Sequence, residues 1–155
     1  MEKKYRLLKD DTITVGGRTL HRIEALKGFT KVKKGDKGGY VEKEDNLSHE
    51  GDCWVAGDAR VFEGALVSGD AWVFGDAHIF GDAWVYDSAQ ICEEACVYGG
   101  ARVYCCARVY DNAQVCGDAD VSGRAQVFGD AFVYCEAQLS DNARVCGDAW
   151  VDGKV

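Results

Sequence analysis

The chain has 155 residues, which is enough for one structural unit with a buried core, and it carries a formal net charge of −8. Residues 1–50 hold twelve Lys or Arg against nine acids, whereas the remainder holds six against seventeen, so we expect the larger part to repel nucleic acid. No stretch has the pattern of a signal peptide or the length of a transmembrane segment, so we expect a cytoplasmic protein with no membrane partner.

The first 38 residues are predicted to form a β cap. Residues 4–8 and 12–24 have the composition of strands, and Gly16-Gly17 separates two runs with alternating apolar residues. A two-residue glycine turn between such runs is typical of a β-hairpin. We expect this cap to cover the first coil of the following domain, whose unpaired backbone groups would otherwise invite another chain to pair with them.

A basic, glycine-rich segment follows the hairpin and contains Lys33, Lys34 and Lys37. Lysines and backbone amides in such a segment can hold a phosphate, which makes these three residues a candidate anion-binding site. Their spacing is not that of a P-loop, and a basic turn is the simpler interpretation.

Residues 51–152 are seventeen consecutive six-residue units without an insertion or deletion. The third place is Ala in sixteen units and Cys53 in the other, and the fifth place is always Val, Ile or Leu. Places three and five point to the same face of an extended strand, so both are expected to be buried. The first two places are mostly Gly, Asp, Asn or Glu, which suit a corner. Extended backwards, this register puts Gly39 and Asp45-Asn46 in corners, so the coil is predicted to begin near residue 39.

Each unit is therefore predicted to form one side and one corner of a triangular parallel β-helix, with three units, or eighteen residues, in each coil. The pattern resembles the hexapeptide repeat of left-handed β-helix proteins, and the handedness is what this resemblance implies. The predicted fold is all-β: a single-stranded left-handed parallel β-helix over residues 39–155 with an N-terminal β-hairpin cap over residues 1–38.

A second resemblance depends on Lys4-Tyr5-Arg6-Leu7, the strand at 20–23, the segment at 32–41, and Asn46-Leu47-Ser48 before Gly51-Asp52-Cys53-Trp54. These motifs are similar to the opening of the YdcK-like proteins, a bacterial and phage group in which such a head precedes hexapeptide repeats. The resemblance implies a bacterial or phage origin and the β-helix fold, and it assigns no activity and no site.

The eight cysteines are expected to be free thiols, because no two of them are eighteen residues apart and so none stack directly on adjacent coils. Neither Cys92 and Cys96 nor Cys105 and Cys106 has a second pair at zinc-site spacing. A row of acids that includes Asp58, Asp76 and Asp130 follows one corner, where calcium could bind, although turn chemistry explains these residues. We expect no metal and no cofactor.

The outward places put aromatic rings in rows along the predicted prism. One side carries Phe62, Phe80, Tyr98 and Tyr134, and the next side carries Phe74, Tyr110 and Phe128, with Trp54 and Trp72 beside them. The third side is expected to be more polar, with Ser68, Tyr86, Tyr104, Ser122 and Ser140. The rings predict either stacked ladders that stabilise the coils or a self-association face that gives a dimer or trimer. Stacked rings could also hold a nucleobase or a sugar.

We therefore expect a non-enzymatic scaffold or binding protein that self-associates through these rings, with a phage or prophage origin as one source. The alternative is a protein that sequesters a nucleotide-like or sugar-like molecule in clefts between subunits. A hexapeptide acyltransferase is the third hypothesis. Such enzymes generally carry a catalytic His and loops that leave the coil, but no loop leaves residues 51–152 and His78 is expected on a flat side.

Overall fold

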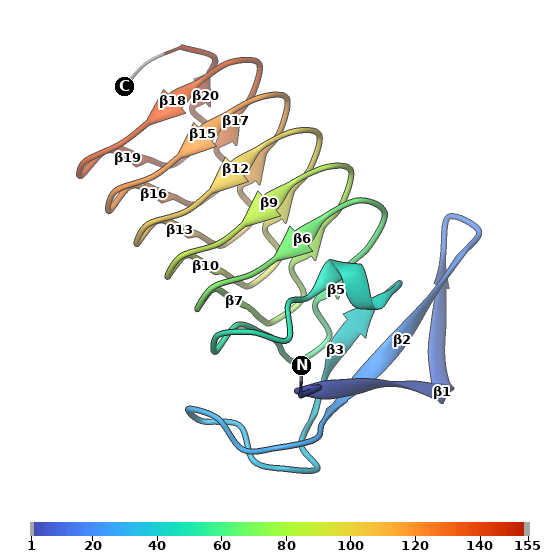
Figure 1. The fold of residues 1–155 in the computed structure, drawn as a ribbon. Coiled ribbons are helices and arrows are strands. Elements are labelled where there is room, and N and C mark those ends of the chain that lie inside the picture. The colour runs from blue at the N-terminus through green and yellow to red at the C-terminus, as the bar shows by residue number, and fades with distance from the viewer. Residues whose placement is uncertain (1, 154–155) are drawn as a thin grey trace.

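A computed structural model describes residues 2–153 as an N-terminal β cap followed by a parallel β-solenoid of about six turns (Figure 1). Strands pair in parallel with the strand eighteen residues further on, as in the pairs Trp54 with Trp72 and Val55 with Val73. No α-helix occurs among the described residues. The predicted all-β solenoid with an eighteen-residue coil is confirmed.

The solenoid has three sides, each a sheet of short parallel strands. Side one contains β5 (Arg60–Val61), β8 (His78–Ile79), β11 (Cys96–Val97), β14 (Gln114–Val115), β17 (Phe132–Val133) and β20 (Trp150–Val151). Side two contains β4 (Trp54–Val55), β7 (Trp72–Val73), β10 (Gln90–Ile91), β13 (Arg108–Val109), β16 (Gln126–Val127) and β19 (Arg144–Val145). Side three contains β6 (Leu66–Val67), β9 (Trp84–Val85), β12 (Arg102–Val103), β15 (Asp120–Val121) and β18 (Gln138–Leu139).

The repeat folds this way because each place of the unit has its own steric requirement. Place three and place five line the inside of the prism, and in the central coils both are fully buried, as Ala101 and Val103 are. Place one adopts positive φ at every corner, for example 62° at Gly57, which glycine accepts without strain. Where the residue is not glycine, Asp or Asn tolerates this conformation best, and Asp111 has φ 58°.

The cap begins with the predicted hairpin, made of β1 (Tyr5–Val15) and β2 (Arg18–Ala25). Gly16 and Gly17 both have positive φ, as a two-residue hairpin turn requires. β3 (Lys37–Val41) pairs antiparallel with β2 and parallel with β5, so the hairpin continues side one beyond the first coil (Figure 1). Residues 4–8 and the first arm of the hairpin, which were expected to be separate strands, lie in one long β1 with an irregularity between Leu7 and Thr12.

The backward extension of the six-residue register is wrong by two residues. Val41 pairs with Val61 and Leu47 with Val67, which are twenty residues apart, whereas all later coils have eighteen. The 3-10 helix η1 (Glu44–Asn46) precedes Leu47. The two additional residues lie between Leu47 and β4, in a segment that turns its carbonyl groups toward the buried Lys4.

Lys4 is fully buried at the start of side two, where it caps backbone carbonyl groups just before β4. Its ammonium donates hydrogen bonds to the carbonyl oxygens of Gly51 (3.2 Å) and Cys53 (2.6 Å) and lies 3.4 Å from the Cys53 sulfur. It also lies over the ring of Phe29. Burial lowers the pKa of Lys4, and burial raises the pKa of the Cys53 thiol. The cap thus supplies N–H donors to carbonyl groups that a preceding coil would otherwise pair.

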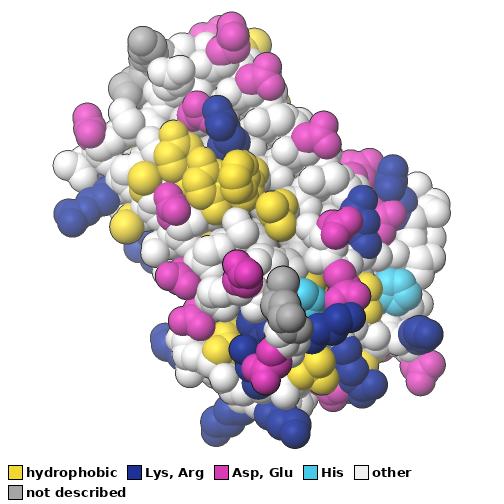
Figure 2. Space-filling view, viewed as in Figure 1, with side chains coloured by type: hydrophobic (Ala, Val, Ile, Leu, Met, Phe, Trp, Pro, Cys, Tyr) yellow, Lys and Arg dark blue, Asp and Glu magenta, His cyan; other side chains and the backbone are white. Residues whose placement is uncertain are grey.

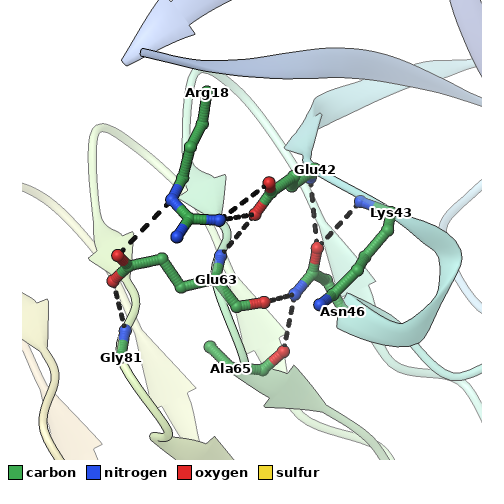
Figure 3. A network of polar contacts seen from close by, with 7 residues as sticks. All are labelled: Arg18, Glu42, Lys43, Asn46, Glu63, Ala65 and Gly81. Atoms are coloured by element: carbon green, nitrogen blue, oxygen red, sulfur yellow. Dashed lines mark hydrogen bonds and ion pairs between the residues drawn. The ribbon is translucent and has the colours of Figure 1, made fainter. Parts of the chain in front are cut away.

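Charged side chains fasten the hairpin to the second coil (Figure 3). Arg18, next to the hairpin turn, is paired with Glu42 at 3.0 Å and with Glu63 at 3.5 Å. Glu42 accepts a hydrogen bond from the backbone N–H of Glu63, and Glu63 accepts one from the N–H of Gly81. Both carboxylates are partly buried, so the network holds the hairpin at a fixed angle to the prism.

Tyr5 gives a prediction at alkaline pH. Its hydroxyl donates toward the carbonyl oxygens of Glu44 and Leu47, its ring stacks on His49, and burial raises its pKa well above the usual value of about 10. Because the folded-state pKa is raised, this contribution is complete below about pH 10 and is lost as the pH rises through the folded value. Tyr5→Phe should therefore cost about 1 to 2 kcal/mol at pH 7, and the difference from wild type should shrink above pH 10. Urea unfolding at pH 7, 10 and 11 measures it, and a constant difference would contradict the account.

Candidate functional site: the outward aromatic surface

The outward rings of sides one and two form stacked ladders. On side one the ring centroids of Phe62 and Phe80 are 5.2 Å apart and those of Phe80 and Tyr98 are 4.9 Å apart. On side two Tyr110 and Phe128 are 5.0 Å apart. These distances follow the strand spacing of about 4.8 Å. The ladder interpretation therefore describes these rings, and their use in self-association stays a prediction.

Two residues predicted for the exposed aromatic face belong to the core under the cap, so this part of the prediction is wrong. Trp54 is only 2% exposed and packs edge-on against Phe29 and Tyr5. Phe62 is 8% exposed and clusters with Leu20 and Tyr40 of the cap. Both lie in the first coils, where cap residues cover the outer surface of the prism.

The most exposed ring in the middle of the prism is that of Trp84, on side three, which had been expected to be the more polar side. Trp84 is 39% exposed, its ring lies 4.2 Å from that of Tyr86, and Tyr86 stacks on Tyr104 at 4.9 Å. Figure 2 shows hydrophobic side chains gathered on the face where the strands of side three lie in Figure 1. We call Leu66, Trp84, Tyr86 and Tyr104 the side-three patch.

The serines in outward place six of side three suggested a polar surface, but Leu66 and Trp84 in place four make part of this surface apolar. Ser68 itself serves the patch, because its hydroxyl accepts a hydrogen bond of 2.9 Å from the Trp84 indole. Leu66 and Trp84 in place four were the sequence signal for this patch, although side three carries fewer outward rings than the other two sides. Next to it, Arg102 forms an ion pair with Asp120 at 3.1 Å. Burial raises the pKa of Tyr86, with a smaller effect of Tyr104.

Tyr134 lies in another aromatic cluster, which spans the last two described turns. It packs against Phe132 and against Trp150, which is 69% exposed. The remaining predicted face residues, Trp72 and Phe74, lie beside each other on side two and are partly exposed.

Two of the candidate anion-binding lysines, Lys33 and Lys34, lie on a β-turn, and Lys37 begins β3. Lys33, Lys34 and Lys37 are exposed, and the N–H of Asp36 donates to the carbonyl of Lys33 across the turn. The Asp36 carboxylate accepts the Lys33 N–H at 2.9 Å, so it occupies an amide that an anion would need. The turn interpretation accounts for this geometry, and anion binding stays a prediction.

His78, the candidate base of the acyltransferase hypothesis, lies on β8 between Arg60 and Cys96 of the adjacent coils. It is partly buried, and burial together with the nearby Arg60 lowers its pKa. An open groove beside it is lined by polar and charged groups that include Asp58 and Asp76. A neutral imidazole at this place could accept a proton, but no side-chain hydroxyl or thiol is hydrogen-bonded to it among the described residues.

The eight cysteines are unpaired. Within residues 2–153, no three His, Cys, Asp or Glu side chains are grouped as metal ligands would be. The described part of the chain also has no helix with the length and apolar character needed to cross a membrane.

Comparison with known proteins agrees with this geometry. The family model described as YdcK beta solenoid repeat matches residues 137–153, which include β18 and β19. A comparison with curated proteins gave no match. The matched segment has the same six-residue unit and the same coil as the rest of residues 51–152. The chain is therefore a β-solenoid protein in which residues 137–153 match the YdcK beta solenoid repeat.

Proposed function

We propose that this protein is a non-enzymatic scaffold that associates with copies of itself through the side-three patch. The observation that carries the proposal is the exposure of Trp84 and its neighbouring tyrosines on an otherwise regular side of the prism. Large exposed rings that lie together are typical of a protein contact surface. Trp and Tyr are also the residues that most often dominate binding energy.

The position of the cap supports side three over the other two sides. The hairpin extends side one, and Phe29 of the cap packs on Trp54 of side two. No cap strand belongs to the sheet of side three. The cap therefore adds no strand to the side on which the contact is proposed.

The charge on side three favours a second copy as the partner. Residues 51–155 have a net charge of −11, from six Lys or Arg and seventeen acids, so two such prisms repel each other in general. The outward residues in places four and six of side three contain one base, Arg102, and one acid, Asp120, and so sum to zero. Contact along this side brings apolar rings together at little electrostatic cost.

The experiment compares the mass in solution of two double variants with that of the wild type by light scattering. Trp84→Ser with Tyr86→Ser removes two rings from side three, and the control, Tyr110→Ser with Phe128→Ser, removes two rings from side two. We expect an oligomer for the wild type and the control, and a dissociation constant raised at least about tenfold for the side-three variant. Equal masses for all three proteins would refute the proposal, and circular dichroism checks that each is folded.

A further inference from the structure

Two adjacent rings of the solenoid lack the ring partner that all the others have. Every other aromatic side chain in residues 51–152 lies in a stacked, tilted or edge-on pair with another ring. Trp72, on β7, and Phe74, just after it, are in none of these pairs. Their rings are only partly buried, so an aromatic surface is left unstacked.

The sequence explains why the ladder is interrupted here. Ala56 occupies the outward place below Phe74, and it is the only alanine in place six of the seventeen units. Cys92 occupies the place above Phe74, so neither adjacent coil offers it a ring. Below Trp72 the ring of Trp54 packs instead against Tyr5 and Phe29 of the cap. The result is a ring-sized gap in the ladder beside Phe74, which we call the ladder gap.

The ladder gap is part of an open groove of about 520 Å³, lined by Ala56, Trp72, Phe74, Gln90, Thr30 and Lys31. This volume lies within the range of about 300 to 1,000 Å³ found for small-molecule sites. The groove is lined mainly by apolar surface, in contrast to the grooves near the acidic corner and the hairpin.

A tight turn of the cap places a positive charge at this groove. Phe29 and Val32 exchange two backbone hydrogen bonds, of 2.9 and 2.7 Å, which leaves Thr30 and Lys31 at the tip. Thr30 has φ 37°, a conformation that a β-branched residue rarely adopts, so the turn is held in shape by its surroundings. Lys31 is exposed, and no ion pair involves it among the described residues.

We propose that the ladder gap binds a planar aromatic ligand that carries an anionic group, of which a nucleotide is one example. The ring would stack on Phe74 in the space over Ala56, next to Trp72, as the rings of neighbouring coils do elsewhere in the ladders. The Lys31 ammonium would pair with the anionic group, and Gln90 and Thr30 would offer hydrogen bonds to polar edges. This site is on side two and does not depend on self-association through side three.

The test is a calorimetric titration of the full chain with adenosine monophosphate, and separately with naphthalene-2-carboxylate, adenosine and ribose 5-phosphate. We expect saturable binding of at least one of the first two probes, and binding about tenfold or more weaker for adenosine and ribose 5-phosphate, each of which lacks one of the two features. Tighter binding of the nucleotide than of the naphthoate would assign recognition to a nucleotide, and equal binding would assign it to aromatic anions in general.

Ala56→Phe is the decisive variant, because it completes the ladder with a ring that the coil spacing accommodates, and it should lower the affinity at least about tenfold. Phe74→Leu removes the ring while keeping an apolar side chain, and should weaken binding similarly. Cys146→Phe, which adds a ring at the far end of the same row, is the control and should bind as the wild type does. The proposal is overturned if neither probe binds the wild type, or if Phe74→Leu and Ala56→Phe bind unchanged.

Discussion

Replacing Asn46 by Ala is expected to lower the free energy of unfolding by about 3 kcal/mol. The side chain is fully buried at the junction of the cap and the solenoid (Figure 3). Its amide group donates to the carbonyl oxygens of Glu63 (3.1 Å) and Ala65 (2.8 Å). Its oxygen accepts the backbone N–H groups of Glu42 (3.1 Å) and Lys43 (2.9 Å). Alanine would leave all four backbone groups without these partners, and buried groups of this kind are costly to leave unpaired.

Urea denaturation measured by circular dichroism tests this expectation. Asn112→Ala is the matched control, because Asn112 lies exposed at a corner of the repeat and makes no side-chain hydrogen bond among the described residues. It should change the free energy of unfolding by less than about 0.5 kcal/mol. Equal effects of the two substitutions would show that the buried amide is not what joins the cap to the coil.

Gly38→Ala is expected to be comparably damaging, for a steric reason. Gly38 lies in β3, the strand that joins the hairpin to side one, and it is buried. A Cβ atom added there would collide with the carbonyl oxygen of Val55 and would lie 2.7 Å from Cγ1 of Ile23. The carbonyl oxygen of Val55 belongs to the backbone, so it cannot move away as the end of a side chain could. We expect a loss of about 3 kcal/mol of stability, the upper end of the cost of overpacking.

Gly28→Ala provides the comparison for this prediction. An added Cβ at Gly28 would meet only the carbonyl oxygen of Val32 at 3.5 Å, an ordinary contact. Thermal unfolding of both variants should show a large decrease in the midpoint for Gly38→Ala and little change for Gly28→Ala. If Gly38→Ala unfolds at the wild-type temperature, the close packing of β3 against the first coil is incorrect.

The regular part of this protein was predictable from its sequence because each place of the repeat has one physical task. Val103 could only point into the prism, and Gly57 could only occupy a corner that requires positive φ. These constraints are local and recur in seventeen units, so the pattern is too regular to have arisen by chance. The hairpin was predictable for a similar reason, because Gly16-Gly17 between alternating runs permits few other structures.

The junction of the cap and the solenoid was not predictable in this way. Asn46 had been assigned to a corner, but two additional residues after Leu47 shift the register there. Its side-chain amide therefore lies inside the first coils and donates to backbone carbonyl groups that would otherwise pair with a strand. Trp54 is buried only because a cap segment from a distant part of the sequence covers it. Such contacts depend on how separate segments pack, which a repeat pattern does not encode.

The candidate site was predictable in kind but not in place. The rows of rings followed from the period of eighteen, and the structure shows them stacked. Their relative exposure depends on the cap, which covers Phe62 and leaves Trp84 open. The ladder gap at Ala56 is visible in the sequence as the one alanine in its place, but its significance appears only when the turn with Lys31 is seen beside it.

Sedimentation of the wild-type protein over a wide range of concentrations tests the central claim, self-association of the solenoid, most directly. The claim predicts an average mass above the 16.9 kDa of one chain, with a decrease toward 16.9 kDa on dilution. A single species of 16.9 kDa at every concentration would contradict it, and would leave the side-three patch as a surface for a different partner.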